Sequence, residues 1–293
     1  MLSIKAVLKN NRPNLSDSSL KTYNSLLSNL YKKVYGDEDI ELEKFNNTGK
    51  FINELKDIDP VRRKTYLAAL VVLTTNNDYQ DVMMDDIQKS KQQIYSQEKN
   101  DKQKDSWIDT EDVMKIYEDL KTKASKLYRK RNKNIDDYQD IQNYVILSLL
   151  GGMFIPPRRL KDYVDFKIKD VDDTKDNFMD KKGFVFNSYK TQKSYRRQNI
   201  TIPKELRMIM NKWIKSNPTD YLLYDTNHNQ LNNVQLVQRL NKIFNNKISV
   251  NQLRHTYMTD KYSETSKTNK LMSDDFKMMG SSIAQEKVYI KTC

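Results

Sequence analysis

The sequence predicts a mostly helical protein with a small antiparallel β-sheet, divided into two domains. Through most of the 293 residues, apolar side chains recur every three or four positions, the spacing that places them on one face of a helix. From Phe184 the pattern changes to the shorter period of strands. Residues 92–105 are polar and charged without apolar periodicity, as linkers are. We therefore expect a helical domain at 1–91, a linker at 92–105 and a second domain at 106–293.

The first domain should contain three or four short helices. Ser16 to Ser19 can cap a helix whose apolar positions run from Leu20 to Val34, and Gly36 can end it. A second helix is predicted at 42–55. A third should follow Pro60, which suits a first helical turn because it lacks the N–H that would be unpaired there.

The second domain should combine a buried helix with a hairpin. A helix capped by Asp109 or Thr110 precedes the apolar stretch 136–150, which we expect to be the core helix and which Gly151 and Gly152 can end. Strands are predicted at 183–190 and 198–203 around a polar turn, with a third at 177–179. Further helices are expected at 204–215, 232–244, 250–262, 269–279 and from 282 to the end.

The composition favours a polyanionic partner. The formal net charge is +12, from 51 Lys and Arg against 39 Asp and Glu. Residues 1–104 hold 17 basic and 15 acidic residues, so the remaining 34 and 24 give residues 105–293 an excess of ten positive charges. Such a surplus releases counterions when it neutralises phosphates, although a solvated basic surface explains the composition equally well.

The remaining composition indicates an intracellular protein without a membrane span. A single cysteine excludes an internal disulfide, and no apolar run approaches the roughly 20 residues that cross a bilayer. No signal peptide is visible at the N-terminus. Two histidines and one cysteine cannot form a zinc cluster, so we expect neither metal nor cofactor.

Four residues occur in an order that suits phosphodiester chemistry. Arginines stand in Ile155-Pro156-Pro157-Arg158-Arg159 and in Val250-Asn251-Gln252-Leu253-Arg254-His255-Thr256-Tyr257, Lys190 stands between them in the expected hairpin, and Tyr289 follows. Guanidinium groups donate paired hydrogen bonds to phosphate oxygens. A lysine can protonate a leaving oxygen when neighbouring cations lower its pKa, and a tyrosine can attack phosphorus when cations stabilise its phenolate.

This order resembles the tyrosine recombinase (integrase) family. Arg159, preferred to Arg158 because an acidic residue follows it three positions later, is similar to the first arginine of the family. Lys190, with Lys193 as the alternative, is similar to the hairpin lysine. Leu253 to Tyr257 looks like the second arginine, Arg254, with the helix it begins, and 278–289 resembles the segment that leads to the nucleophile, Tyr289.

Two positions depart from the family pattern. Asn251 stands where the family usually has histidine or lysine, and Gly280 stands where it usually has histidine or tryptophan. Asn251 can still donate a hydrogen bond to a phosphate oxygen, whereas Gly280 can offer only its backbone N–H. We expect His255 to pack or to face a phosphate rather than to carry a proton.

The resemblance implies a two-domain clamp on double-stranded DNA that cuts and rejoins strands through a 3′-phosphotyrosyl intermediate, as an integrase or site-specific recombinase. It also implies assembly on DNA as a dimer or tetramer. With only 290–293 after Tyr289, we expect a monomer in free solution. A type IB topoisomerase and a non-catalytic DNA-binding relic are the alternatives. The Asn- and Lys-rich sequence suits an AT-rich virus or mobile element acting in the host nucleus or cytoplasm.

Overall fold

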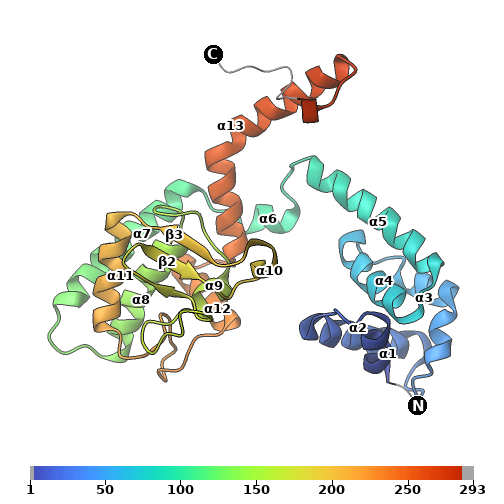
Figure 1. Cartoon of the computed structure of the whole chain (residues 1–293), viewed down its shortest axis with the longest axis horizontal. Helices are drawn as coiled ribbons and strands as arrows, with labels where there is room; N and C mark the ends of the chain where they lie inside the picture. Colours follow the sequence, from blue (N-terminus) through green and yellow to red (C-terminus); the bar gives the residue numbers. More distant parts are fainter. Residues whose placement is uncertain (1–2, 286–293) are drawn as a thin grey trace. The chain divides into compact units, whose positions relative to one another are not determined.

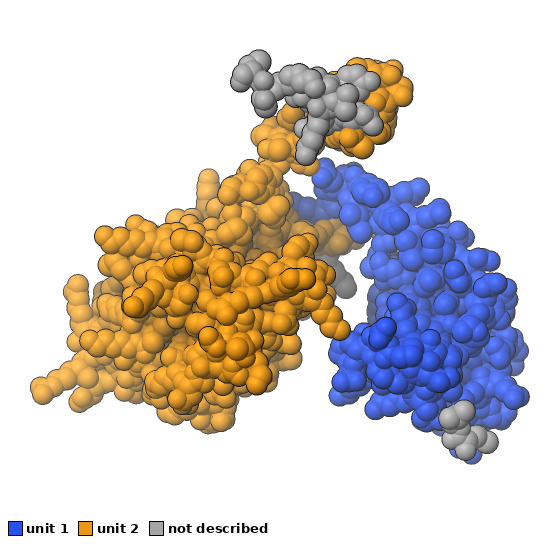
Figure 2. All heavy atoms as spheres, viewed as in Figure 1, with its two compact units in different colours: residues 1–99 blue, residues 100–293 orange. Residues whose placement is uncertain are grey.

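The chain folds into two compact units, residues 1–99 and 100–293 (Figures 1 and 2). The computed structural model describes residues 3–285. It is mainly helical with one three-stranded antiparallel sheet, as the sequence predicts. The boundary between the units lies within the stretch 92–105, which also contains the end of one helix and all of α6 (Asp101–Asp105).

Unit 1 is entirely helical in its described part. Its elements are α1 (Ile4–Asn11), α2 (Asp17–Tyr35), the 3-10 helix η1 (Leu42–Asn46), α3 (Thr48–Leu55), α4 (Pro60–Thr74) and α5 (Asn77–Tyr95). Ser16 caps α2, and Asp59 caps α4 just before Pro60. The single helix predicted at 42–55 is wrong, because the Asn47 side chain accepts the Lys50 N–H and begins a new helix there.

The core of unit 1 combines leucines with a cluster of aromatic rings, and a buried ion pair joins two of its helices. Phe45 and Phe51 are fully buried and stack with ring centroids 5.1 Å apart. Arg63 of α4 donates to both carboxylate oxygens of the fully buried Asp86 on α5, at 2.6 and 2.8 Å. This two-point contact joins α4 to α5, and it offsets the cost of burying the carboxylate.

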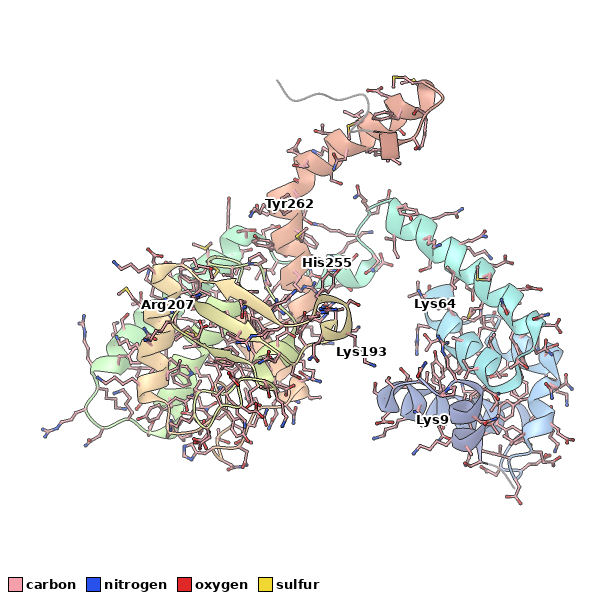
Figure 3. The ribbon with its side chains drawn as sticks, in the orientation of Figure 1. Lys9, Lys64, Lys193, Arg207, His255 and Tyr262 are labelled. Carbon is pink, nitrogen blue, oxygen red and sulfur yellow. The ribbon has the colours of Figure 1, made fainter. Side chains whose placement is uncertain are left out.

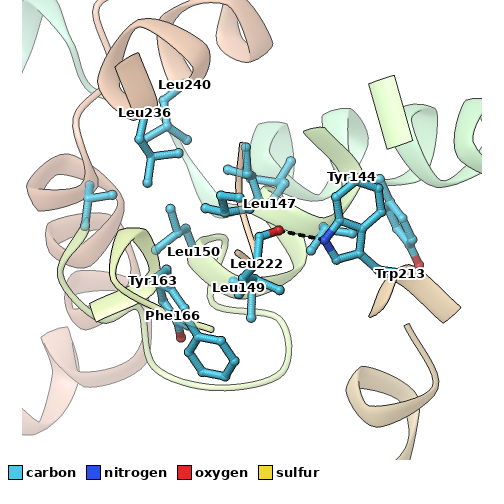
Figure 4. Packing of buried hydrophobic residues seen from close by; sticks show 14 of the residues in the cluster. Tyr144, Leu147, Leu149, Leu150, Tyr163, Phe166, Trp213, Leu222, Leu236 and Leu240 are labelled. Carbon is cyan, nitrogen blue, oxygen red and sulfur yellow. Dashed lines mark hydrogen bonds between the residues drawn. The ribbon is translucent and has the colours of Figure 1, made fainter. Parts of the chain in front are cut away.

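Unit 2 is built around α8 (Ile135–Leu150), the core helix that the sequence predicts. Eleven of its residues are buried, including Ile141, Val145 and Leu149. Figure 4 shows this core, with the Trp213 indole donating to the Leu222 carbonyl at 2.8 Å. The other helices are α7 (Thr110–Arg129), α9 (Leu160–Val164), α10 (Gln192–Tyr195), α11 (Lys204–Ser216), α12 (Asn233–Phe244), α13 (Val250–Met278) and the 3-10 helix η2 (Ile283–Gln285). Both α7 and α11 pack against α8, while α12 packs against α9.

The sheet has the order β1-β2-β3, with strands β1 (Phe178–Met179), β2 (Gly183–Phe186) and β3 (Gln198–Thr201). Val185 pairs with Phe178 on one side and with Asn199 on the other. The predicted first strand of the hairpin is too long, because β2 ends at Phe186 rather than at Lys190. The next residue, Asn187, turns its amide inward to donate to the carbonyls of Asp173 and Asp176, both at 2.8 Å.

Helix α13 is one continuous helix of 29 residues, so the prediction of separate helices at 250–262 and 269–279 is wrong. The segment between them is polar but contains no glycine or proline, and Glu264 pairs with Lys267 at 2.6 Å across one turn. The helix ends at Met278, and Gly280, two residues later, has a φ of +69°, which suits glycine. Of the helix predicted from 282, the structure describes only η2, and the rest lies outside the described residues. Among the described helices, none is both long and apolar enough to cross a membrane.

Asn177 ties α9 to the segment after β2. Its buried side-chain amide donates to the Asp162 carbonyl at 3.0 Å and to the Ser188 carbonyl at 2.8 Å. Its oxygen accepts the backbone N–H groups of Asn187 and Ser188 at 2.9 and 2.8 Å. All of its hydrogen-bonding capacity is therefore used to hold two segments that lie far apart in the sequence.

We predict that Asn177→Asp destabilises unit 2 by about 2–4 kcal/mol, because a carboxylate cannot donate and leaves two buried carbonyls without partners. Urea unfolding followed by tryptophan fluorescence measures this, since both tryptophans, Trp107 and Trp213, lie in unit 2. Asn227→Asp, which adds the same charge at an exposed position, is the control. An unchanged midpoint for Asn177→Asp would show that this amide does not hold the segments together.

Candidate active site

The first arginine pair stands at the start of α9. Pro156 and Pro157 keep the preceding backbone extended, and Arg159 is the N-cap residue of the helix, with φ −72° and ψ 153°. The helix is fixed from below by Tyr163, which is fully buried and packs edge-on against Phe184 and Phe186 of β2. The backbone of the two arginines is thus set by the sheet beneath them.

Arg158 is fully engaged in holding this region together. Its Nε donates to Asp162 Oδ2 at 2.8 Å, and its Nη1 donates to the Gln198 side-chain oxygen on β3, also at 2.8 Å. Its guanidinium lies 4.0 Å from the centre of the Phe186 ring. Arg158 therefore braces α9 against the hairpin, and its charge is largely compensated.

Arg159 and Arg254 line the same cavity, although 94 residues separate them in the sequence. The cavity has a volume of about 540 Å³. Neither side chain forms a hydrogen bond or an ion pair with any other residue that the structure describes. The lining residues are Ile155, Pro156, Pro157, Arg158, Arg159, Asp162, Tyr189, Thr191, Tyr195, Gln198, Asn199, Ile200 and Arg254.

The position of Arg254 is set by the first turns of α13. Ser249 caps the helix by accepting the Gln252 N–H at 3.2 Å. On either side of Arg254, Leu253 is buried and the Thr256 hydroxyl donates to the Ile108 carbonyl at 2.7 Å. These contacts hold the first turns of α13 in place, and Arg254 on these turns lines the cavity.

A glycine allows α13 to approach the loop before α9. A Cβ atom at Gly152 would lie 2.7 Å from Cδ2 of Tyr257, closer than side chains tolerate. Gly152 also has a φ of +86°, which an L side chain rarely adopts. The Gly151-Gly152 pair predicted to end the core helix therefore has a second effect, because it brings α13 against the segment that leads to Arg159.

Asp162 is the acidic partner in this cationic cavity. Burial raises the pKa of its carboxyl above the ordinary value, and the guanidinium groups of Arg158, Arg159 and Arg254 oppose this effect. Its Oδ1 has no hydrogen-bond partner among the described atoms, while Oδ2 accepts from Arg158. The charges of Arg158 and Asp162 offset each other, so the cavity presents the two remaining arginines to an anion.

A second cavity, of about 290 Å³, adjoins the first. Asn251, Arg254, His255 and Met258 line it from one face of α13, and Arg254 lines both cavities. The spacing of three, four and seven residues places these side chains together. Asn251 and His255 are both exposed, so each can reach a ligand that extends beyond Arg254. Figure 3 shows His255 on α13.

The two hairpin lysines lie outside the cavity walls. Lys190 stands four residues after β2, in a turn rather than at a strand end, and Lys193 stands on α10 (Figure 3). Both side chains are exposed, and neither lines the cavity. Thr191 and Tyr195 of the same hairpin do line it. The structure therefore brings together Arg159 and Arg254, and places the lysines on the loop beside them.

Gly280 lies just after α13 and lines neither cavity. Gly280 donates its N–H to the Lys277 carbonyl at 3.0 Å, and Ser281 donates to the Phe276 carbonyl at 2.8 Å. This pair of bonds closes the C-terminus of α13, so the Gly280 N–H is already used within the helix end. Tyr289 lies outside the described residues.

Sequence reasoning missed the residues that support the arginines. The sequence places Gln198 only within a strand and Asn177 only at the start of one. Tyr195, which lines the cavity, carries no signal that singles it out. The adjacent arginines Arg158 and Arg159 are a sequence signal for an anion site. When one of them pairs with the nearby carboxylate of Asp162, the other is free to bind a ligand. No group of three or more metal-ligating side chains is found among the described residues.

The sequence matches no family model and no curated protein. Among solved structures, the chain is similar to XerA recombinase, with 14% identity over 88% of this chain and 84% of that one and a TM-score of 0.33. It is also similar to a lambda integrase (75–356) dimer bound to a COC′ core site, with 11% identity over 86% and 85% of the two chains and a TM-score of 0.45. By name, the first of these structures is a recombinase and the second is an integrase.

Proposed function

We propose that this protein is a DNA recombinase of the integrase type, which cuts and rejoins strands through a 3′-phosphotyrosyl intermediate. The observation that carries the proposal is the meeting of Arg159 and Arg254, both unpaired among the described residues, in one cavity. Two guanidinium groups in one cavity suit a phosphodiester, whose non-bridging oxygens gain charge when phosphorus is attacked.

Each proposed role follows from the chemistry of its side chain. Arg159 and Arg254 hold the scissile phosphate, and Asn251 donates to the same phosphate from the adjoining cavity. Tyr289 attacks phosphorus, forming the phosphotyrosyl bond and breaking the bond to the 5′ oxygen. Lys190, or Lys193, gives that leaving oxygen its proton. In rejoining, the 5′ hydroxyl attacks and Tyr289 leaves, so the phosphodiester is conserved.

The partner in this proposal is double-stranded DNA, on which two or four copies of the chain assemble. The net charge of +12 supports a polyanionic partner. Two alternatives use the same cavity. A type IB topoisomerase would cut and rejoin one duplex as a monomer, and a non-catalytic relic would bind without cutting. The main support for the non-catalytic relic is that the Gly280 N–H already donates to the Lys277 carbonyl, so it cannot also donate to a phosphate.

We expect Tyr289→Phe to bind DNA as the unchanged protein does but to form no covalent adduct on a nicked suicide duplex, because only the attacking oxygen is removed. Denaturing gel electrophoresis of labelled DNA measures the adduct, and Tyr95→Phe, an exposed tyrosine of unit 1, is the control. Absence of an adduct with the unchanged protein would favour the relic. If an adduct forms, exchange between two duplexes separates recombinase from topoisomerase.

Arg159→Ala and Arg254→Ala should each lower the cleavage rate by about 10²–10³ or more, since each removes one donor from the phosphate in the transition state. Single-turnover cleavage of the suicide duplex measures the rate. Arg131→Ala, which removes the same charge from an exposed position between α7 and α8, should cleave at nearly the original rate. Full cleavage by either active-site variant would reject its assignment.

Lys190→Ala should be rescued by a substrate whose 5′ bridging oxygen is replaced by sulfur, because a thiolate leaves without a proton. The same substrate should not rescue Arg159→Ala. The ratio of cleavage rates on the sulfur and oxygen substrates measures the rescue. If Lys193→Ala is rescued and Lys190→Ala is not, the proton comes from α10 instead of the turn before it.

A further inference from the structure

Tyr195 is an exposed aromatic residue on the rim of the cavity that holds Arg159 and Arg254. It ends α10, and 66% of its surface is exposed. It also lines the cavity, yet its side chain has no ring contact or hydrogen bond with any other described residue. The Tyr195 ring and the two unpaired arginines together suit a ligand that has a flat apolar face as well as a negative charge.

The backbone around Tyr195 is held in a conformation that ordinary residues avoid. Arg196, which follows it, has a φ of +54°. The Tyr189 hydroxyl donates to the Arg196 carbonyl at 2.5 Å, and the Arg196 N–H donates to the Gln192 carbonyl at 2.7 Å. Tyr189 itself lines the cavity. The backbone conformation directly after Tyr195 is therefore held by Tyr189, a residue that lines the cavity.

The remaining walls match the same kind of ligand. Ile155, Pro156, Pro157 and Ile200 give the cavity apolar sides next to the arginines. The segment 190–197 adds four exposed cations, Lys190, Lys193, Arg196 and Arg197. A phosphate alone would leave the apolar sides and the Tyr195 ring in water, whereas a nucleotide would cover them.

We propose that the cavity takes a whole nucleotide with an unstacked base, which lies on the Tyr195 ring while its phosphate meets Arg159 and Arg254. The inference rests on the proposed function, because it assumes that the bound phosphate belongs to DNA. The preferred substrate is then DNA with an unpaired nucleotide, as at a bulge, a nick or a strand junction. In continuous duplex both faces of each base are already stacked, so Tyr195 gains no such contact there.

The proposal is tested by comparing the affinity of the protein for two duplexes. The first contains one unpaired thymidine, and in the second that nucleotide lacks its base but keeps its phosphate. The unchanged protein should bind the thymidine bulge about tenfold more tightly, as expected when one base stacks on an aromatic ring. Tyr195→Ala should bind the two duplexes equally, and Tyr195→Phe should keep the preference. Tyr262→Ala, which removes another exposed tyrosine, is the matched control and should also keep it.

Photocrosslinking locates the contact. A bulge that carries 5-iodouracil should crosslink to the peptide containing Tyr195, and the crosslink should be lost in Tyr195→Ala. Three results would each overturn the proposal. The unchanged protein could bind the two bulges with equal affinity, Tyr195→Ala could keep the preference, or the crosslink could map to another peptide. These measurements need no cleavage, so they give a result whether or not the phosphotyrosyl adduct forms.

Discussion

The arrangement of unit 2 depends on the Asn177 amide. This side chain is buried, and its four hydrogen bonds join the Asp162 carbonyl of α9 to the backbone of residues 187 and 188. Because a buried amide is stable only when its donors and acceptors are used, the two segments can take few other relative positions. The arginines at the start of α9 and the hairpin beyond β2 are therefore placed by one shared constraint.

The charges of the cavity are arranged so that some cations remain free. Arg158 gives its hydrogen bonds to Asp162 and Gln198 and lies over the Phe186 ring, which makes it part of the scaffold. Arg159 has the same side chain one residue later and has no such partner among the described residues. Adjacent residues of one type thus have opposite roles, because only the first lies over the sheet.

The sequence predicted the fold class, the core helix 136–150 and the approximate strands, because these depend on apolar periodicity within short windows. The expectation that Arg159 and Arg254 act together came from a resemblance of order and spacing, and both residues line one cavity. The roles of Asn177 and Gln198 could not be predicted, since their partners lie 10 to 40 residues away and polar side chains leave no periodic signal. The continuity of α13 was missed because a polar segment without breakers suits either a loop or an exposed helix.

The unbroken length of α13 has a mechanical consequence. At about 1.5 Å per residue, Gly280 lies about 39 Å along the helix axis from Arg254. The nine residues from 281 to 289 span about 30 Å when fully extended. Because about 30 Å is shorter than about 39 Å, position 289 can return to Arg254 of its own chain only if α13 unwinds. Residues 267–271 of α13 are all exposed, so a loss of helix costs least there.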